Sequence, residues 1–483
     1  MVSQNATSPR SFYRRRRLVR RWRYRLAPDP WRDRPKAPPA LGKRLRRVIW
    51  LWWPWAILAV VFTARDQWGW AAGAALLAGF TFLATPAEQS PQFGLEHQFA
   101  VADPEFLATM TGATGERPIE GNGIAILNNG DEFYPAMLDA IRQASASVTI
   151  EAYIYWDGEI GKEVAAALAE RARAGIPVKI LLDAVGSATI GEEILRTLEA
   201  GRCQVAWYNP LRWYSLGRLN HRTHRKSLII DGAIAFTGGA GIADHWRGTA
   251  QDPDHWRDIQ VRIEGPAARP LQTGFAHNWL QTTGELISGP AFYPPPAPAG
   301  ALAAFAVMSS PEAGASSVRQ MYYLSIVCAR HSIYIANPYF IPDEVAVAAL
   351  LDARRRGVDV QIMVSGIHND AWLARQNSVR LYGALLAGDI VVWEYNRTML
   401  HQKTMVVDGL WATVGTTNFD NRSFAHNEEN NVCVYDAAWA GELQQVFLRD
   451  VAVSDRVDLA SWRRRGLRSR AQEIVASFLE DQV

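Results

Sequence analysis

The sequence has little cysteine. Its 483 residues include three, Cys203, Cys328 and Cys433, and none of them stands in a C-x-x-C pair. This argues against a disulfide scaffold and against a cysteine-ligated zinc site, and it fits a reducing compartment. Charged residues make up 20% of the chain, too many for a polytopic transporter, and the 48% hydrophobic residues exclude disorder throughout. The length allows two or three domains.

Acidic residues are nearly absent from residues 1–47. This arm carries 16 lysines and arginines against Asp29 and Asp33, a net charge of +14, and the remaining chain carries −11, which together give the total of +3. A basic arm ahead of a mildly acidic body is typical of chains that bind nucleic acid or an anionic membrane. The residues that follow the arm favour the membrane.

Two uncharged apolar runs follow the arm, Val48–Thr63 and Trp68–Thr85, with a short polar stretch between them. Each run is at or just below the roughly 17–25 residues of a membrane-spanning helix. Six tryptophans lie between Trp50 and Trp70, which suits the headgroup boundary. We expect a transmembrane hairpin over residues 48–85, with the arm and the rest of the chain on the cytoplasmic side. A single interfacial or re-entrant segment is the alternative.

The rest of the chain repeats itself. A strand pattern at 147–155 returns at 332–340, and a helix end followed by a strand at 172–183 returns at 354–365. Strands that alternate with helices predict an α/β fold with a largely parallel or mixed sheet. Two sheets packed about a pseudo-twofold axis would place corresponding segments opposite each other. The predicted domains are the first copy at 121–288, a proline-rich linker at 289–303 and the second copy at 304–483.

Each copy carries the pattern His-x-Lys-x4-Asp, followed by a turn that contains glycine. An Asp-Gly pair between apolar runs ends each pattern and predicts a β-hairpin. The triplet occurs by chance roughly once per 10⁴–10⁵ positions, so its presence at equivalent places of a repeat is informative. The residues are His224, Lys226 and Asp231 with Gly238 and Gly239, and His401, Lys403 and Asp408 with Gly415, Thr416, Thr417 and Asn418.

The spacing of these residues points to phosphodiester chemistry. On a strand, residues i and i+2 share a face, so His224 and Lys226 point together, as do His401 and Lys403. Two such faces that meet would surround one phosphodiester, with lysines offsetting its charge. One neutral imidazole attacks phosphorus and the other, protonated, donates to the leaving oxygen. No metal or other cofactor is required. Solvated strand faces, or a metal site at His221 and His224, are the alternatives.

The duplicated motifs resemble those of the phospholipase D superfamily, and within it the bacterial cardiolipin synthases. The resemblance runs from about Gly121 to the C-terminus and includes the stretches 220–226, 337–343 and 418–423. It implies two duplicated phospholipase D-like α/β/α sandwich domains behind an N-terminal membrane hairpin. It also implies a place at the bacterial inner (plasma) membrane, with the catalytic body in the cytoplasm.

The resemblance assigns roles to the two histidines. His224 would be the nucleophile that forms a phosphohistidine, and His401 would act as acid and then as base. Members of the family often have asparagine where the first copy has Gly241, so one phosphate donor is missing there. The residues expected to bind the substrate phosphate are Lys226, Lys403, Asn418, Gly239 and Thr416.

The resemblance also implies a carboxylate behind each histidine. Asp258 is the candidate partner of the first-copy histidine, and Glu429 is the candidate partner of the second-copy histidine. The adjacent Glu428 is the alternative to Glu429. Asp231 and Asp408 complete the motif, and we expect them to fix the hairpins and the nearby backbone.

The substrate class follows from charge and tethering. An acidic body disfavours a nucleic-acid groove. Aromatic and basic residues alternate at 207–218, where Arg212 and Arg218 would meet lipid headgroups unless this loop packs on the body. The segment 462–479 is either a helix lying on the membrane surface or a solvated helix that closes the fold. We expect phospholipid substrates, phosphatidylglycerol first, an anionic membrane and no nucleic acid as partners; the oligomeric state stays open.

The resulting prediction is a membrane-anchored phosphatidyltransferase of the cardiolipin synthase type. The phosphatidyl group moves to His224, and a hydroxyl of phosphatidylglycerol, activated by His401, then attacks to give cardiolipin. A membrane-bound phospholipase D that yields phosphatidate is one alternative. A nuclease or nucleic-acid-binding protein that uses the basic arm is another. An inactive scaffold is disfavoured because both His/Lys pairs are intact.

Overall fold

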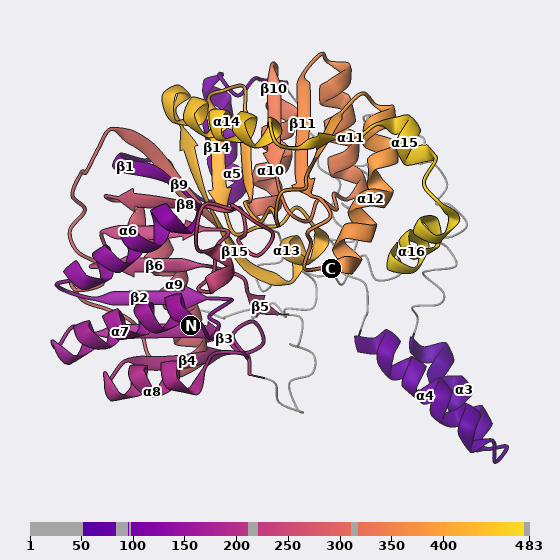
Figure 1. Cartoon of the computed structure of the whole chain (residues 1–483), viewed down its shortest axis with the longest axis horizontal. Coiled ribbons are helices and arrows are strands. Elements are labelled where there is room, and N and C mark those ends of the chain that lie inside the picture. The colour runs from indigo at the N-terminus through magenta and orange to yellow at the C-terminus, as the bar shows by residue number, and fades with distance from the viewer. Residues whose placement is uncertain (1–51, 84–94, 96–97, 211–220, 311–316, 478–483) are drawn as a thin grey trace, which may run out of the picture. The chain divides into compact units, whose positions relative to one another are not determined.

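The structure is a computed structural model in which helices and strands alternate along most of the chain (Figure 1). The expected basic arm 1–47 and the expected headgroup contacts of Arg212 and Arg218 lie outside the residues that the structure describes. The described residues are 52–83, 95, 98–210, 221–310 and 317–477.

Two apolar helices form a unit that we describe by itself. They are α3 (Trp52–Thr63) and α4 (Trp68–Leu83), and a short turn that contains Asp66 at φ 56° joins them. The two predicted apolar runs are therefore helical where the structure describes them. Within the described residues, however, no helix combines the length and the apolar character that crossing a bilayer requires.

The described residues of the first half of the body form four long helices and eight strands. The helices are α6 (Asn129–Gln143), α7 (Glu159–Arg173), α8 (Glu192–Ala200) and α9 (Ala268–Thr283). The strands are β1 (Ile119–Asn128), β2 (Val148–Ala152), β3 (Val178–Asp183), β4 (Gln204–Tyr208), β5 (Arg222–Thr223), β6 (Ser227–Ile230), β7 (Ile234–Gly238) and β8 (Ile259–Glu264).

The second half repeats this series. Its strands are β9 (Leu302–Ser309), β10 (Ser332–Ala336), β11 (Asp359–Ser365), β12 (Val391–Tyr395), β13 (Thr404–Val407), β14 (Trp411–Gly415), β15 (Asn427–Tyr435) and β16 (Asp455–Arg456). Its helices are α10 (Ser317–Cys328), α11 (Glu344–Arg355), α12 (Trp372–Ala387), α13 (Asn421–Ala425), α14 (Ala437–Val451), α15 (Leu459–Arg463) and α16 (Leu467–Ser477).

The strand order confirms the predicted duplication and the mixed sheet. In the first half β2, β3 and β4 are parallel, while β6, β7, β8 and β1 continue antiparallel from β2. The second half has the same pattern, with β10, β11 and β12 parallel and β13, β14, β15 and β9 antiparallel. Each of these strands therefore has a counterpart at the same place in the other half.

The two halves share one sheet, where we expected two. Strand β1 pairs with both β8 and β9, so the described strands form a single sixteen-stranded sheet. Strand β14 also packs on β7 and β8, because twist accumulates along so long a sheet and folds it back on itself. A core of residues from both halves results, including Ile126 and Val261 from the first and Val414 and Val432 from the second.

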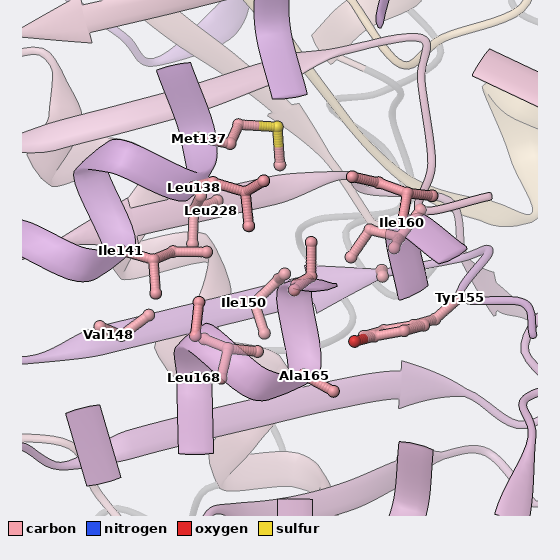
Figure 2. Close-up of a cluster of buried hydrophobic side chains, with 14 of the residues drawn as sticks. Met137, Leu138, Ile141, Val148, Ile150, Tyr155, Ile160, Ala165, Leu168 and Leu228 are labelled. Atoms are coloured by element: carbon pink, nitrogen blue, oxygen red, sulfur yellow. The ribbon is translucent and has the colours of Figure 1, made fainter. Parts of the chain in front are cut away.

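A second core lies under α6 and α7 in the first half. Ile160, Val164 and Leu168 recur every four residues on α7, so they form one apolar stripe that is fully buried. This stripe packs on β2, where Ile150 is buried, and Figure 2 shows Ile150 and Leu168 in one cluster with Leu138 and Ile141 of α6. Strand β2 is buried along its whole length because α9 covers its other face.

Both predicted hairpins are present. Asp231 and Gly232 have φ of 55° and 65°, and Asp408 and Gly409 have φ of 54° and 61°. Two successive positive φ angles are the requirement of the two-residue turn that best matches the strand twist. These turns join β6 to β7 and β13 to β14.

Asp231 and Asp408 bind each hairpin to the segment that leads into the first parallel strand of its half. The carboxylate of Asp231 accepts the backbone amides of Ser145, Ala146 and Ser147, at 2.7 to 3.1 Å. Asp408 binds the corresponding amides before β10 in the same way. Both aspartates therefore fix the backbone, as we expected from the sequence.

The ends of the body pack on the second half. Helix α5 (Pro104–Thr114) precedes the first half in sequence, yet its Phe106 meets Trp411 edge to face at 5.3 Å. At the other end, α16 packs on α12, and Asn377 donates a hydrogen bond to the carbonyl of Ala476. The segment 462–479 thus closes the fold where the structure describes it, although Leu467 remains 83% exposed.

Replacing Asp231 with asparagine should lower the free energy of unfolding by about 1–3 kcal/mol, because three amides lose a charged acceptor. Burial would raise the pKa of Asp231, but the amides outweigh it and lower the pKa. The contribution is therefore present above about pH 4 and is lost as pH falls through the lowered pKa. Urea unfolding at pH 7 and pH 3 measures both effects. Asp389→Asn is the control, because Asp389 is exposed and has a similar φ of 60°. An equal loss of stability in both variants would contradict the role assigned to Asp231.

Candidate active site

The two His-x-Lys segments lie just before β6 and β13 and not within strands, which corrects our expectation. The reason is that each histidine amide binds the opposite half of the molecule. The amide of His224 donates to the carbonyl of Glu428 at 2.9 Å, and that of His401 donates to the carbonyl of Arg257 at 2.7 Å. Both motifs are therefore anchored at the boundary between the halves.

The histidine side chains also bind carboxylates of the opposite half. Nδ1 of His224 lies 3.0 Å from both carboxylate oxygens of Glu429, and Nδ1 of His401 lies 2.9 Å from Oδ2 of Asp258. The predicted pairing was therefore wrong, because it matched each histidine with the next carboxylate along its own copy. The strands that carry the carboxylates face the other half, so the pairs cross.

Neither of the two adjacent glutamates supports His401, although we expected one of them to do so. Glu428 binds Arg225 at 2.6 Å and accepts the hydroxyl of Ser310 at 2.7 Å. Its carboxylate therefore holds the neighbouring segment in place, and of the two only Glu429 contacts the ring of the first-half histidine. Glu429 is fully buried.

Asp258 and Glu429 occupy equivalent places in the repeat. Gly238 pairs with Gln260 in the first half, and Gly415 pairs with Asn431 in the second. Each carboxylate stands two residues before the partner of its glycine. The duplication thus placed one acidic residue in each half, aspartate in the first and the longer glutamate in the second.

The first-half carboxylate is held by a tryptophan. Asp258 accepts the indole N–H of Trp246 at 2.9 Å and the amide of Ile259 at 2.8 Å. Gly239 leaves room for it, since a Cβ there would lie 2.3 Å from Oδ1 of Asp258 and 2.6 Å from the carbonyl of His401. Trp246 was missed in the sequence because no motif marks a buried tryptophan as a hydrogen-bond donor.

The second-half carboxylate is held by a threonine. The hydroxyl of Thr416 donates to Glu429 at 2.6 Å, and the side-chain amide of Asn427 donates at 3.2 Å. Thr416 is the counterpart of Gly239, and we expected both among the phosphate ligands. Instead, the side chain of Thr416 is committed to Glu429, and Gly239 lies against the other carboxylate.

Both motif lysines are buried beside their histidines. Nζ of Lys403 lies 3.0 Å from both ring nitrogens of His401. Nζ of Lys226 donates to the carbonyl of His224 at 2.9 Å and lies 5.4 Å from the ring centre of Tyr153. Burial and then the charge of Lys403 lower the pKa of Lys226 to about 7. Burial also lowers the pKa of Lys403 to about 8, although the charges of the nearby carboxylates act to raise it.

The environment favours the neutral forms of both imidazoles. Burial and the motif lysines lower the pKa of His224 to about 4, although the charge of Glu429 acts to raise it. Burial and Lys403 likewise lower the pKa of His401. The charge of Lys403 thus contributes to lowering the pKa of both histidines.

Aromatic rings enclose the histidines. The ring of Tyr153 meets His224 edge to face at 5.0 Å, while Trp246 and Trp256 lie 5.4 and 5.6 Å from His401. These rings exclude water around the imidazoles and fix their orientation. Tyr153 belongs to a segment that we read only as a strand, so its role was missed. No group of three or more His, Cys, Asp or Glu side chains in the described ranges is arranged to hold a metal ion.

The turns after the motifs differ between the halves for a steric reason. The side-chain oxygen of Asn418 is buried and has no hydrogen-bond partner among the described residues, so it remains available to a ligand. At the equivalent Gly241, a Cβ would lie 2.9 Å from the Cβ and the carbonyl oxygen of Ile154. An asparagine does not fit there, and close packing, not a left-handed turn, explains the glycine.

The crossed pairing predicts which substitutions are coupled. His224→Ala and Glu429→Gln each break one buried pair, so the double variant should lose less stability than the two single losses added together. We expect a coupling energy of about 0.5–3 kcal/mol. His224→Ala with Asp258→Asn, which belong to different pairs, is the matched control and should be close to additive. Urea unfolding of the six proteins measures both cycles. Stronger coupling to Asp258 than to Glu429 would contradict the crossed geometry.

Comparison with known proteins agrees with this site. The family model described as cardiolipin synthase, PLD-like domain, matches residues 137–279 and 325–451, which include both motifs. A solved structure with similar architecture is the phosphatidylserine synthase of Haemophilus influenzae Rd KW20. It has a TM-score of 0.59 and 14% identity and covers 77% of this chain and 97% of its own. At this identity, the likeness concerns the fold.

Curated relatives are closer in sequence. The cardiolipin synthase of Geobacillus thermodenitrificans (strain NG80-2) is 32% identical over 369 residues, which are 76% of this chain and 73% of the relative. The major cardiolipin synthase of Bacillus subtilis (strain 168) is 33% identical over 368 residues, which are 74% and 75% of the two chains. With two crossed His-carboxylate pairs, a duplicated fold and these matches, the chain belongs to the cardiolipin synthase family of phospholipase D-like proteins.

Proposed function

We propose that the protein is a phosphatidyltransferase that transfers a phosphatidyl group to phosphatidylglycerol and so makes cardiolipin. One observation carries the proposal: two buried imidazoles, each oriented by a carboxylate of the other half, share a site with two buried lysines. Such a site supplies a nucleophile, an acid/base and two cations for a phosphodiester. The relatives named cardiolipin synthase support the choice of lipid.

In the first half-reaction, His224 is the nucleophile. Its Nδ1–H donates to Glu429, so the lone pair of Nε2 is free to attack phosphorus. A P–N bond forms as the P–O bond to the leaving alcohol breaks, and His401 donates its proton to that oxygen. The negative phosphodiester raises the pKa of His401 when it binds and so counteracts the effect of burial. Glycerol leaves if the donor is phosphatidylglycerol.

In the second half-reaction, His401 acts as the base. It takes the proton of an acceptor hydroxyl, whose oxygen attacks the phosphohistidine, and the P–N bond breaks as the new P–O bond forms. Asp258 stabilises the imidazolium that results. His224 returns to its neutral form, and His401 is protonated again for the next cycle.

Lys226 and Lys403 offset the phosphate charge, and Asn418 offers its side chain to the same group. Both ammonium groups are buried, where their electrostatic effect on a developing charge is larger than in water. The unpartnered side-chain oxygen of Asn418 supports its assignment as a substrate contact. Because it is the amide oxygen that lacks a partner, the bond it would accept comes from a hydroxyl of the headgroup, and the amide nitrogen is the donor for phosphate.

We also propose that α3 and α4 hold the enzyme at a bilayer. Their exposed side chains are large and apolar, with Val60, Trp70 and Leu76 between 69% and 76% exposed. Apolar surfaces of this kind mark membrane or protein contacts. A tether raises the effective concentration of lipid phosphodiesters at the site. The inner-membrane location and the cytoplasmic side of the body are part of this proposal.

The two histidine variants should fail at different steps. His224→Ala should lose at least about a thousand-fold in turnover and form no phosphoenzyme, because the nucleophile is gone. His401→Ala should lose about 10²–10⁴-fold and accumulate phosphohistidine when the leaving group needs little protonation. Labelled phosphatidylglycerol, with lipid product analysis and acid-labile phosphoenzyme detection, measures both.

His277→Ala is the control for the histidine variants, because His277 is exposed on α9. It should retain wild-type turnover. Phosphatidate as the main wild-type product would identify a hydrolase instead of a transferase. Phosphoenzyme in His224→Ala would overturn the assignment of the nucleophile.

The pH profile of kcat/KM should be bell-shaped, because this ratio reports ionisations of the free enzyme. Activity falls as pH rises through about 7 to 8, where Lys226 and then Lys403 lose the protons that offset phosphate charge. It falls on the acid side near pH 4, where His224 gains a proton and loses its lone pair. Initial rates on mixed micelles between pH 3 and pH 10 measure the profile. A rate that still rises above pH 9 would contradict it.

A further inference from the structure

A polar cavity of about 310 Å³ lies at the boundary between the halves, outside the crossed pairs. Polar and basic side chains from both halves line it. The residues that matter are Asn128, Asn129 and Arg257 from the first half and Tyr395, Arg397 and Arg449 from the second. Three arginines from three different segments therefore meet around one space.

Arg257 forms the fixed wall of this cavity. Its Nε donates to Asp450 at 3.0 and 3.1 Å, and Nη1 donates to Asn129 and to the carbonyl of Asp258, both at 3.0 Å. Nη2 donates to Asn128 at 3.1 Å. These bonds use all but one of its five N–H groups. The side chain is 6% exposed and cannot swing away.

Arg397 and Arg449 are the free charges of the cavity. Both are exposed, and neither forms an ion pair with a residue that the structure describes. The two carboxylates at the cavity are already engaged, since Asp450 binds Arg257 and Glu132 accepts the amide of Asn128 at 2.7 Å. Three guanidinium groups and two carboxylates line the cavity, so its charge is net positive, and guanidinium groups are well suited to bind phosphate.

The cavity adjoins His401 and not His224. The carbonyl of Arg257 accepts the amide of His401 at 2.7 Å, and the next residue, Asp258, holds the ring of His401. From Arg397 the chain reaches His401 in four residues, which span at most about 14 Å. The wall of the cavity is therefore bonded to the segment of the histidine that acts as acid and base in the proposed function.

We propose that this cavity is a second phosphate site, which holds the phosphate of the acceptor lipid. The inference rests on the proposed function, in which the acceptor hydroxyl is deprotonated by His401. In phosphatidylglycerol, that hydroxyl is separated from its own phosphate by one glycerol unit. A phosphate bound by Arg397 and Arg449 places the hydroxyl on the His401 side of the site. The product cardiolipin carries two phosphates joined by one glycerol, which matches two neighbouring phosphate sites.

Two measurements on the full-length, detergent-solubilised chain test the proposal. Equilibrium dialysis with inorganic phosphate counts the sites, and rates on mixed micelles give the KM for phosphatidylglycerol. Arg397→Gln with Arg449→Gln should remove one of two phosphate sites and raise KM at least about tenfold, as expected for the loss of charged hydrogen bonds. Phosphohistidine formation from the donor lipid, measured in a single turnover, should change far less. Arg196→Gln with Arg355→Gln removes two exposed charges on α8 and α11 and is the matched control.

Each outcome decides the proposal. An unchanged number of phosphate sites in the Arg397/Arg449 variant overturns the site. Loss of one site with unchanged KM shows that the cavity takes free phosphate and overturns the acceptor lipid as its source. An equal rise in KM in the control variant attributes the effect to net charge and also overturns the proposal. If the wild type makes no cardiolipin, the proposed function fails, while the phosphate count still tests the cavity.

Discussion

Each motif histidine depends on a carboxylate of the opposite half, and the remainder of the site follows from this crossing. A buried carboxylate without a partner costs several kcal/mol, so Glu429 and Asp258 are tolerable in the interior only when the two halves are docked. The backbone amides of both histidines likewise donate hydrogen bonds to carbonyls of the opposite half. Neither half therefore holds a complete site. The groups of the site come together only at the boundary between the halves.

The crossing explains why the charges of the site are arranged as they are. Two lysines and two imidazoles are buried within one small volume, and burial disfavours their charged forms. Asp258 and Glu429 oppose burial most directly, and Asp183, Asp370 and Asp420 add smaller effects. A bound phosphodiester would favour the protonated forms of these groups and so counteract the effect of burial. An anionic substrate is in this sense part of the electrostatic network of the site.

The two halves have kept one framework and diverged in its details. Asp231 and Asp408 bind equivalent amides, and Asp258 and Glu429 occupy equivalent positions. The donors that hold the carboxylates differ, however: Trp246 serves the first and Thr416 the second. These differences give the two histidines unequal surroundings, which two identical groups need if one is to attack while the other transfers protons. The polar cavity lies on the His401 side alone and adds to this inequality.

Much of this protein could be read from its sequence, because the signals are local. Turn chemistry at Asp231-Gly232 and Asp408-Gly409 predicted the hairpins, and the repeated pattern at 172–183 predicted a helix end followed by a strand. The duplicated His-x-Lys pattern predicted the four central side chains. Even the binding of backbone by the motif aspartates was foreseen. In each case neighbours along the chain decide the conformation, so no knowledge of distant contacts is needed.

Only the tertiary structure decided which groups meet. The partner of each histidine was assigned to the wrong carboxylate, since nothing within one copy reveals that the strands face the other copy. Trp246 was missed for the same reason, because its indole reaches Asp258 only in the folded chain. The polar cavity lined by Arg257, Arg397 and Arg449 was missed as well, because these residues come from three distant segments. The sequence by itself therefore determined the elements and the reactive side chains, whereas the folding back of one continuous sheet determined their partners, because those contacts join residues that lie far apart along the chain.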